Sequence, residues 1–222
     1  MNANEEGRVI LIDKPLHWTS ADVVKKIRNQ VHTKVGHAGT LDPLATGLLI
    51  LCTGKFTKKI NEYMLQEKEY TGTITLGSTT ASFDLETLPE NYREFSFVNT
   101  TLLSEVSKKF TGEIIQIPPI YSAIKKNGER SYDLARQGRA VTLEGRKVFI
   151  KEFEMQILQL PLVHFRVVCS TGTYIRSLAN DIGQTLGCGA HLSSLCRTRI
   201  GIYKLDDALS PEAAISKIKT GS

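Results

Sequence analysis

Residues 35–47 read VGHAGTLDPLATG, and residues 48–52, which follow directly, read LLILC. The one carboxylate of the first segment, Asp42, precedes Pro43, which biases the backbone of Asp42 toward extended geometry. The apolar run that follows is typical of a buried strand. The sequence therefore predicts a single carboxylate on a constrained loop anchored by a core strand, a setting in which binding and catalytic groups are common. Asp before Pro is also an ordinary turn pair, so these residues alone leave a purely structural role for Asp42 open.

The composition is typical of a globular protein. The chain has 222 residues, of which 41% are hydrophobic and 23% are charged, and this length suffices to bury a sizeable core. No apolar run is long enough to span a membrane, and residues 1–8 lack the pattern of a signal peptide, so we expect a cytoplasmic protein without membrane contact. The four cysteines form no C-x-x-C pair, so we expect buried, reduced thiols and no metal site.

The net charge of +5 is distributed unevenly. Lysines and arginines outnumber acidic residues by 9 to 5 in residues 1–60 and by 12 to 6 in residues 116–199, whereas acidic residues prevail by 9 to 4 in residues 61–115. Two basic blocks around an acidic segment suit a polyanionic partner. A solvated basic surface without a partner fits the charge equally well.

Apolar periodicity predicts strands and helices in irregular order. We expect strands at residues 9–12, 48–52, 68–77, 113–117, 146–160, 162–170 and 200–203. We expect helices at residues 19–31, 56–64, 102–110, 131–138 and 175–186, and a last one capped by Ser210. Residues 78–97 read as a loop and residues 190–197 as a short turn. Because strands and helices do not alternate regularly, we expect an α+β fold.

Residues 36–47, GHAGTLDPLATG, resemble the signature motif of the bacterial tRNA pseudouridine-55 synthases. Further segments resemble motifs of that family in the same order, so the likeness covers most of residues 8–203: IDKP at 12–15, KEY at 68–70, GTYIRSL at 172–178 and AHLSSLCRTR at 190–199. Residues 117–123 and 135–138 also resemble the family, and we assign them to framework and RNA contact. The resemblance implies the pseudouridine-synthase catalytic fold, with a mixed, mostly antiparallel central sheet flanked by helices.

The resemblance implies three catalytic residues. Asp42 would be the catalytic aspartate. Tyr70 would pack on the flipped-out target base, for which a flat apolar partner is physically suitable, although a strand tyrosine is otherwise usually a core residue. Arg176 would pair with Asp42 and keep it ionised; without the resemblance it reads as a surface arginine.

The resemblance also implies five binding residues. Tyr174 would contact the uracil, Leu195 would touch the target base, and His37 would contact the target nucleotide or fill the space that it leaves. Lys14 and Pro15 would brace the catalytic loop next to the substrate. No second histidine stands at ligand spacing from His37, so a metal-binding role for it is rejected.

The resemblance implies isomerisation of uridine 55 in the T-loop of transfer RNA, with the T-arm stem-loop as partner, no cofactor and a monomeric enzyme. Asp42 would act as a nucleophile on the ribose or on uracil C6, or would help to remove a ribose proton to give a glycal; the residues do not choose among these routes. A non-catalytic RNA-binding or RNA-folding module is the alternative function. A glycosidase would usually need a second carboxylate near the first, and no partner for Asp42 is evident.

Many members of that family continue into a small C-terminal RNA-binding domain of the PUA type. Only about twenty residues follow the last matching segment, so we expect residues 1–222 to form a single catalytic domain with the PUA-type domain absent. Residues 79–89 follow the acidic loop of the family only loosely, and we assign no role to Asp84 there.

Overall fold

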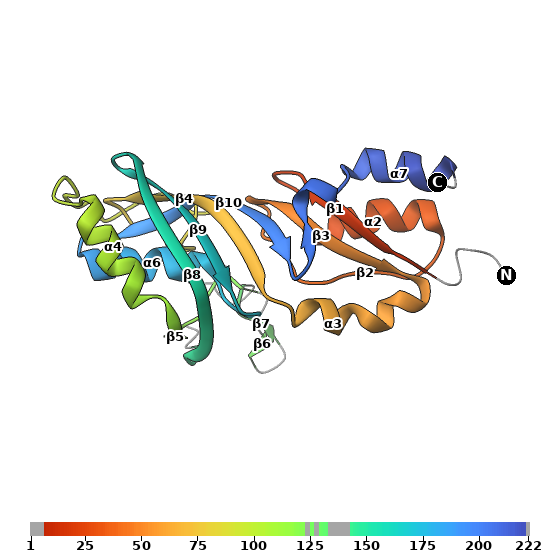
Figure 1. Ribbon diagram of the computed structural model, residues 1–222, viewed down its shortest axis with the longest axis horizontal. Coiled ribbons are helices and arrows are strands. Elements are labelled where there is room, and N and C mark those ends of the chain that lie inside the picture. Colours follow the sequence, from red (N-terminus) through yellow and green to blue (C-terminus); the bar gives the residue numbers. More distant parts are fainter. Residues whose placement is uncertain (1–6, 123–124, 127–128, 133–142, 221–222) are drawn as a thin grey trace. The chain divides into compact units, whose positions relative to one another are not determined.

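The computed structural model describes residues 7–122, 125–126, 129–132 and 143–220. Its backbone contacts group into two compact units (Figure 1). Unit 1 comprises Met1–Thr71 and Ser194–Ser222, and unit 2 comprises Gly72–Ser193. Strands β4 (Lys68–Leu76) and β10 (Ala190–Ile200) each contribute residues to both units. The prediction that residues 1–222 form one catalytic domain stays a prediction.

Unit 1 is built around strand β3 (Ala45–Thr53), which contains the predicted apolar run. β1 (Val9–Lys14) pairs antiparallel with one edge of β3, from Val9 opposite Cys52 to Lys14 opposite Gly47. On the other edge, β10 pairs in parallel with residues 45–47 and the short β2 (Val35–His37) pairs antiparallel with residues 51–53. β11 (Tyr203–Lys204) extends the sheet beside β10.

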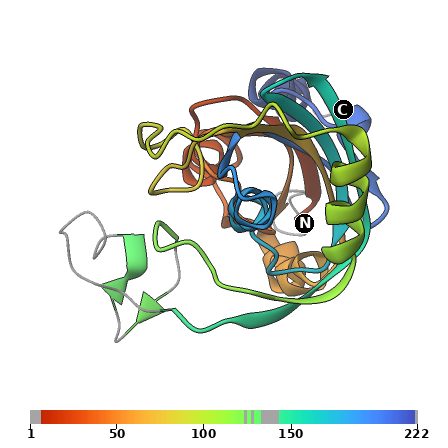
Figure 2. The ribbon, with the colours of Figure 1, turned by 90° about the vertical axis from the view of Figure 1, so that its left-hand side faces the viewer.

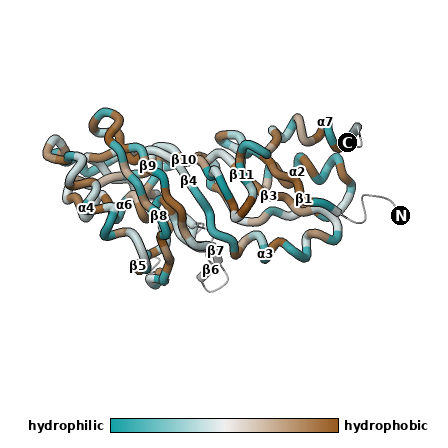
Figure 3. Tube along the Cα trace, in the orientation of Figure 1, coloured by the Kyte–Doolittle hydropathy of each residue, from teal (hydrophilic) through white to brown (hydrophobic). Residues whose placement is uncertain are grey.

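Both faces of β3 are buried, which explains its unbroken apolar sequence. Leu49 and Leu51 point into a core that also includes residues of β1, α2 (Ser20–Val31) and α7 (Pro211–Thr220). Leu48, Ile50 and Cys52 point to the opposite side, where Tyr63 of α3 (Ile60–Met64) and Ile200 complete a second core. Figure 3 shows the apolar colouring of β1 and β3. The 3₁₀ helix η1 (Gly54–Lys59) joins β3 to α3, so the helix predicted at 56–64 is only partly α-helical.

The cap predicted for the last helix is confirmed, and α2 of the same unit also begins with a side-chain cap. The Thr19 hydroxyl accepts a hydrogen bond from the backbone N–H of Asp22 at 3.0 Å, and the Asp22 carboxylate accepts one from the backbone N–H of Thr19 at 2.9 Å. This capping box fixes the start of α2. At α7, the Ser210 hydroxyl accepts from the backbone N–H of Ala213, and Pro211 occupies the first helical position.

Unit 2 places its strands in the order β10, β4, β9 (Leu162–Cys169), β8 (Arg146–Gln159) and β5 (Gly112–Gln116). β8 and β9 form a long antiparallel hairpin, and β5 pairs antiparallel with β8. Figure 2 views α6 (Ile175–Leu186) end-on, with β8 and β9 curving past it. α4 (Thr100–Lys109) contacts β8, and β6 (Lys125–Lys126) pairs with β7 (Glu129–Arg130).

The predicted α+β class and the mixed, mostly antiparallel sheet are confirmed. The turn predicted at 190–197 is wrong, because those residues belong to the eleven-residue strand β10. Polar side chains make this strand hard to recognise in the sequence, and several of them have hydrogen-bond partners on β4: Ser193 donates to the Thr73 carbonyl and Thr198 to the Glu69 carboxylate. The helix expected at residues 102–110 corresponds to α4, and Gly112 begins β5. The helix predicted at 131–138 falls largely outside the described residues.

The described helices include none that is long and apolar enough to cross a membrane. Within the described ranges, no group of three or more His, Cys, Asp or Glu side chains is arranged to hold a metal ion. The four cysteines are free thiols; Cys52, Cys169 and Cys188 are buried as expected, whereas Cys196 is half-buried.

Candidate active site

Asp42 lies on the loop of unit 1 that connects β2 to β3, and neighbouring side chains and backbone hold this loop on several sides. The buried hydroxyl of Ser20 accepts a hydrogen bond from the backbone N–H of Leu41 at 2.9 Å and donates to the carbonyl of the same residue at 3.2 Å. The backbone N–H of His17 donates to the Pro43 carbonyl at 2.8 Å, and Ala45 N–H donates to the Asp42 carbonyl at 3.0 Å. Asp42 itself is half-buried. The carboxylate is therefore carried by a backbone that has little freedom to move.

Arg197 braces the same loop from strand β10. Its guanidinium is 1% exposed and donates through Nη2 to the Gly39 carbonyl at 3.0 Å and through Nε to the Leu48 carbonyl at 2.8 Å. The backbone of Arg197 also passes so close to Gly47 that a Cβ on that glycine would lie 2.4 Å from the Arg197 carbonyl oxygen. Gly47 has φ +100°, which only glycine adopts readily. Sequence reasoning missed this arginine because it assigned the segment to a turn.

Lys14 is a fully buried cation in unit 1. Its ammonium donates to the carbonyls of Pro15 at 2.9 Å and Trp18 at 2.6 Å, which closes the turn that carries Pro15. Burial lowers the pKa of Lys14 to about 8, and the Asp42 carboxylate opposes this by favouring the charged form. Lys14 and Asp42 therefore interact electrostatically, and the Lys14 ammonium fixes the turn after β1.

The other binding residues predicted in unit 1 lie on strands. His37 ends β2 and is half-buried; its Nδ1 is buried and has no hydrogen-bond partner among the described residues. Burial, and next the charge of Arg197, lower the pKa of His37. Tyr70 is 8% exposed on β4, on the side of the strand that also carries Lys68. Leu195 is half-buried on β10 and pairs with Ala45, at the end of the Asp42 loop.

In unit 2, Arg176 lies at the start of α6 and is 3% exposed, so its reading as a surface arginine is wrong. Its guanidinium donates to the carbonyls of Tyr121 at 2.9 Å and Ser82 at 3.3 Å. Its Nε lies 3.6 Å from the Asp84 carboxylate. Asp84 is itself buried and accepts hydrogen bonds from the Ser82 hydroxyl at 2.6 Å and the Glu86 backbone N–H at 3.0 Å.

Asp84 is thus a functional candidate that sequence reasoning did not assign. A buried carboxylate beside a buried guanidinium compensates its charge, which neither group could bear alone in a core. The signal for it was weak, because a Ser-x-Asp pattern in a polar loop is common in exposed turns. The pair forms a charged centre within unit 2, and one of its members, Arg176, is the residue predicted to orient Asp42.

Tyr174, the residue before α6, is held through its backbone and its ring. The fully buried amide of Gln116 accepts from the Tyr174 backbone N–H at 2.7 Å and donates to its carbonyl at 3.0 Å. The guanidinium of Arg146 lies 4.7 Å from the centre of the Tyr174 ring, in cation–π contact. Arg146 also donates a hydrogen bond from Nη2 to the Gly172 carbonyl at 2.8 Å, which holds the guanidinium beside the Tyr174 ring.

Unit 1 therefore contains six of the eight predicted site residues: Lys14, Pro15, His37, Asp42, Tyr70 and Leu195. Unit 2 contains Tyr174 and Arg176. The pairing of Asp42 with Arg176 would join the two units and stays a prediction, as do the roles assigned to all eight residues.

Comparison with known families gives matches along most of the chain. Residues 25–175 match the family described as "TruB family pseudouridylate synthase (N terminal domain)". Residues 176–214 match "tRNA pseudouridylate synthase B C-terminal domain". Two curated relatives, each named "tRNA pseudouridine synthase B", come from Flavobacterium johnsoniae and Phocaeicola vulgatus. The first is 53% identical over 92% of this chain and 93% of its own length, and the second is 50% identical over 94% and 92%.

Two solved structures are also similar to this chain. One is described as "Crystal Structure of a Cbf5-Nop10-Gar1 Complex", with 31% identity over 98% of this chain and a TM-score of 0.74. The other is described as "Structure of H/ACA RNP bound to a substrate RNA containing 2'-deoxyuridine", with 29% identity over 99% of this chain and a TM-score of 0.72. This chain spans 57% and 56%, respectively, of the chains that it matches in them.

Proposed function

The chain belongs to the TruB family of pseudouridylate synthases, and we propose that it converts uridine 55 in the T-loop of transfer RNAs to pseudouridine. The relatives at about half identity bear the name of a tRNA-modifying enzyme and match nearly the whole chain. A protein that acts on transfer RNA works where that RNA is made and used, so we place it in the cytoplasm. The T-arm stem-loop is the part of the substrate that it would bind.

The reaction rearranges one nucleoside and adds no atoms from a donor. The bond from ribose C1' to uracil N1 breaks, the uracil turns, and a bond forms from C1' to uracil C5. The proton on C5 leaves to solvent and N1 gains one, so atoms and charge balance without an oxidant or reductant. Asp42 acts as the nucleophile on the ribose or on uracil C6, or assists loss of a ribose proton to a glycal; all three routes need an ionised carboxylate.

The observation that carries this proposal is the way in which the Asp42 loop is held. Its backbone is bonded to Ser20, His17 and Arg197, and the buried ammonium of Lys14 interacts with the Asp42 carboxylate. Catalytic groups gain most of their rate advantage when they are held in the reacting geometry before substrate arrives. A loop that served only as a turn would not require a buried cation on one side and a buried arginine on the other.

The remaining predicted residues receive their roles within this proposal. Tyr70 supports the flipped-out base, Arg176 orients Asp42, and Tyr174, Leu195 and the side chain of His37 contact the target nucleotide. Flipping the uridine out of its stack costs a few kcal/mol, so the enzyme must recognise the shape and backbone of the folded loop.

The test uses a T-arm stem-loop RNA that carries tritium at C5 of one target uridine and catalytic amounts of protein. We expect wild type to release tritium and Asp42→Asn to bind the RNA with unchanged affinity but to lose turnover by about 10⁴-fold or more. Asp206→Ala removes an exposed carboxylate from the same unit and should keep full turnover. Tight binding without release by wild type would favour the RNA-binding module, and free uracil among the products would favour a glycosidase.

A further inference from the structure

Helix α2 presents a second side-chain stripe in addition to the one that it buries. Its core stripe consists of Ser20, Val23, Ile27 and Val31. Residues spaced at i, i+3, i+4 and i+7 share one face of a helix, and four such residues line a pocket of about 550 Å³: Ala21, Val24, Lys25 and Arg28. The other walls are Val35, Gly36 and His37 of β2 and Ile60 of α3. We call this the α2–β2 pocket; Figure 1 shows β2 between α2 and α3.

The α2–β2 pocket contains two cations and no carboxylate among its lining residues. Lys25 and Arg28 are exposed, and neither side chain makes a hydrogen bond or ion pair with any described residue. The apolar lining residues with larger side chains are Val24, Val35 and Ile60. A pocket lined by these side chains and by two exposed cations suits a ligand that is apolar in part and anionic in part.

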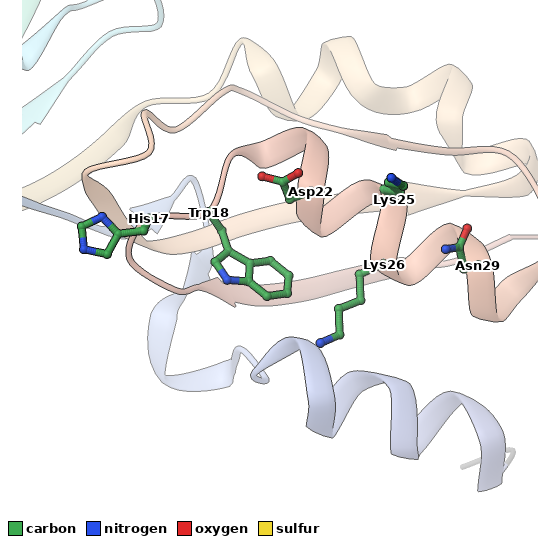
Figure 4. A pocket seen from close by; sticks show the side chains of 6 residues that line it. All are labelled: His17, Trp18, Asp22, Lys25, Lys26 and Asn29. Atoms are coloured by element: carbon green, nitrogen blue, oxygen red, sulfur yellow. The ribbon is translucent and has the colours of Figure 1, made fainter. Parts of the chain in front are cut away.

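A neighbouring pocket on α2 shows the contrast. It has a volume of about 490 Å³ and is lined by His17, Trp18, Asp22, Lys25, Lys26 and Asn29 (Figure 4). Its cation Lys26 extends toward α7, where it pairs with Glu212 at 2.5 Å, and lies 4.9 Å from the centre of the Trp18 ring. A carboxylate, Asp22, is part of its wall. The charge of Lys26 in this pocket is therefore paired, whereas Lys25, which lines both pockets, and Arg28 form no ion pair with a described residue and can meet an anion.

The α2–β2 pocket also begins at the base of the Asp42 loop. His37 lines it and is followed by Ala38, whose N–H bonds to Ile50 and starts that loop. The buried Nδ1 of His37 has no partner among the described residues, and burial and the Arg197 charge lower the pKa of its imidazole. The ring is therefore neutral at pH 7 and can offer one hydrogen-bond donor and one acceptor. A ligand in this pocket lies next to the segment that carries the proposed catalytic carboxylate.

We propose that the α2–β2 pocket binds the sugar–phosphate backbone of RNA next to the target uridine, with Lys25 and Arg28 each contacting a phosphate. This inference rests on the proposed function, which supplies a polyanion whose target nucleotide must reach Asp42. The ribose lies against Val24 and Ile60 and the phosphates meet the two cations. Backbone contacts of this kind position the RNA without reading its sequence.

The first test measures the salt dependence of RNA binding. Affinity for a fluorescent T-arm stem-loop is determined for wild type and for the double variant Lys25→Ala/Arg28→Ala. The KCl concentration runs from about 50 to about 300 mM, so that the dependence of log K on log salt can be measured. We expect the slope of log K against log salt to fall in magnitude by about 2, since each lost phosphate contact removes about 1. The matched control, Lys217→Ala/Lys219→Ala, removes two exposed lysines from α7 of the same unit.

The control should leave the slope unchanged, and all three proteins should have the same melting temperature because the four side chains are exposed. Equal slopes for wild type and the pocket variant would overturn the proposal. An equal reduction in both double variants would also overturn it, because the effect would then follow from net charge alone.

The second test locates the phosphate. Single phosphates on either side of the target uridine are replaced by uncharged methylphosphonates. At one or two positions the replacement should weaken binding of wild type about tenfold and leave binding of the pocket variant unchanged, because the same contact cannot be lost twice. Equal responses of both proteins at every position would refute the contact.

The two proposals can fail separately. Binding is measured in the Asp42→Asn background as well, where no turnover takes place. A smaller salt slope in the pocket variant, together with no tritium release by wild type, would support RNA binding at the pocket and refute the proposed reaction. Tritium release by wild type with unchanged slopes would retain the reaction and reject the pocket.

Discussion

Ser20→Ala tests how the Asp42 loop is held. The substitution removes two hydrogen bonds between the Ser20 hydroxyl and the backbone of Leu41, at 2.9 and 3.2 Å. Both residues are at most 3% exposed, so water cannot replace the lost bonds. A buried polar group left without a partner costs about 1–3 kcal/mol. Two such groups, the N–H and the carbonyl of Leu41, lose their partner, which costs about 4 kcal/mol at the middle of this range. Alanine favours the helix by about 0.5 kcal/mol over serine, so we expect the free energy of unfolding to fall by about 3–4 kcal/mol.

The substitution should also reduce turnover, since Leu41 adjoins Asp42 and a displacement of about 1 Å at a reacting group costs about 10²-fold in rate. Urea unfolding measures the first effect and tritium release from the labelled stem-loop measures the second. Ser107→Ala is the control, because among the residues that the structure describes the Ser107 hydroxyl bonds only to the Ser104 carbonyl of the same helix, α4. It should cost less than about 0.5 kcal/mol and leave turnover unchanged.

A Ser20→Ala protein that loses less than 1 kcal/mol (well below the value expected for two buried groups) and turns over as wild type would refute the reasoning. The loop would then be held by its remaining contacts alone, and pre-positioning through Ser20 would not contribute to the activity.

Three further changes have definite expected outcomes. Asp84→Ala leaves the Arg176 guanidinium buried without its 3.6 Å partner and should lower the free energy of unfolding in urea by about 3–5 kcal/mol, with Asp84→Asn losing less. Burial lowers the pKa of Lys14 from 10.5 to about 8. Between pH 8 and pH 10.5 the unfolded chain therefore binds more protons than the folded chain. The stability of wild type should therefore rise from pH 8 to 10.5, by about 3 kcal/mol, and urea titrations of Lys14→Met should lack this rise. Gly47→Ala would bring a Cβ to 2.4 Å from the Arg197 carbonyl at φ +100° and should lower stability by about 3 kcal/mol or more, as thermal unfolding would show.

Elements whose pattern matches their burial were predictable from the sequence. The helix expected at residues 175–186 is α6, whose apolar stripe of Ile175, Leu178, Ile182 and Leu186 is buried. Gly187 ends this helix in the left-handed conformation. The run 48–52 predicted β3 because a strand covered on both faces has no polar positions. In such segments the local signal and the tertiary environment agree.

Elements whose polar residues are satisfied by distant partners were not predictable. Strand β10 carries Arg197 in its middle, and the reason lies in the carbonyls of Gly39 and Leu48, about 150 residues away along the chain. Asp84 reads as a loop residue until Arg176, also remote in sequence, is placed beside it. Single-sequence patterns record only near neighbours, so interactions that close over such separations leave no local periodicity.

The candidate site residues were identified in a different way from the helices and strands. Tyr70 and Arg176 were selected by resemblance, since no local pattern distinguished them from core or surface residues. Asp42 was indicated by its constrained loop, and the resemblance decided between a catalytic residue and a turn residue. The burial of Arg176 and the bracing of the Asp42 loop are consistent with those selections and give physical reasons for them.

Strand β3 is covered on both faces and paired along both edges. Its amide hydrogens can exchange with solvent only when unit 1 opens as a whole, so they should be among the most slowly exchanging in the protein. The loop that carries Asp42 leads directly into this strand at Ala45, so no flexible segment separates the loop from the core. On heating, the catalytic geometry should persist until the unit melts cooperatively, and inactivation should then be abrupt rather than gradual.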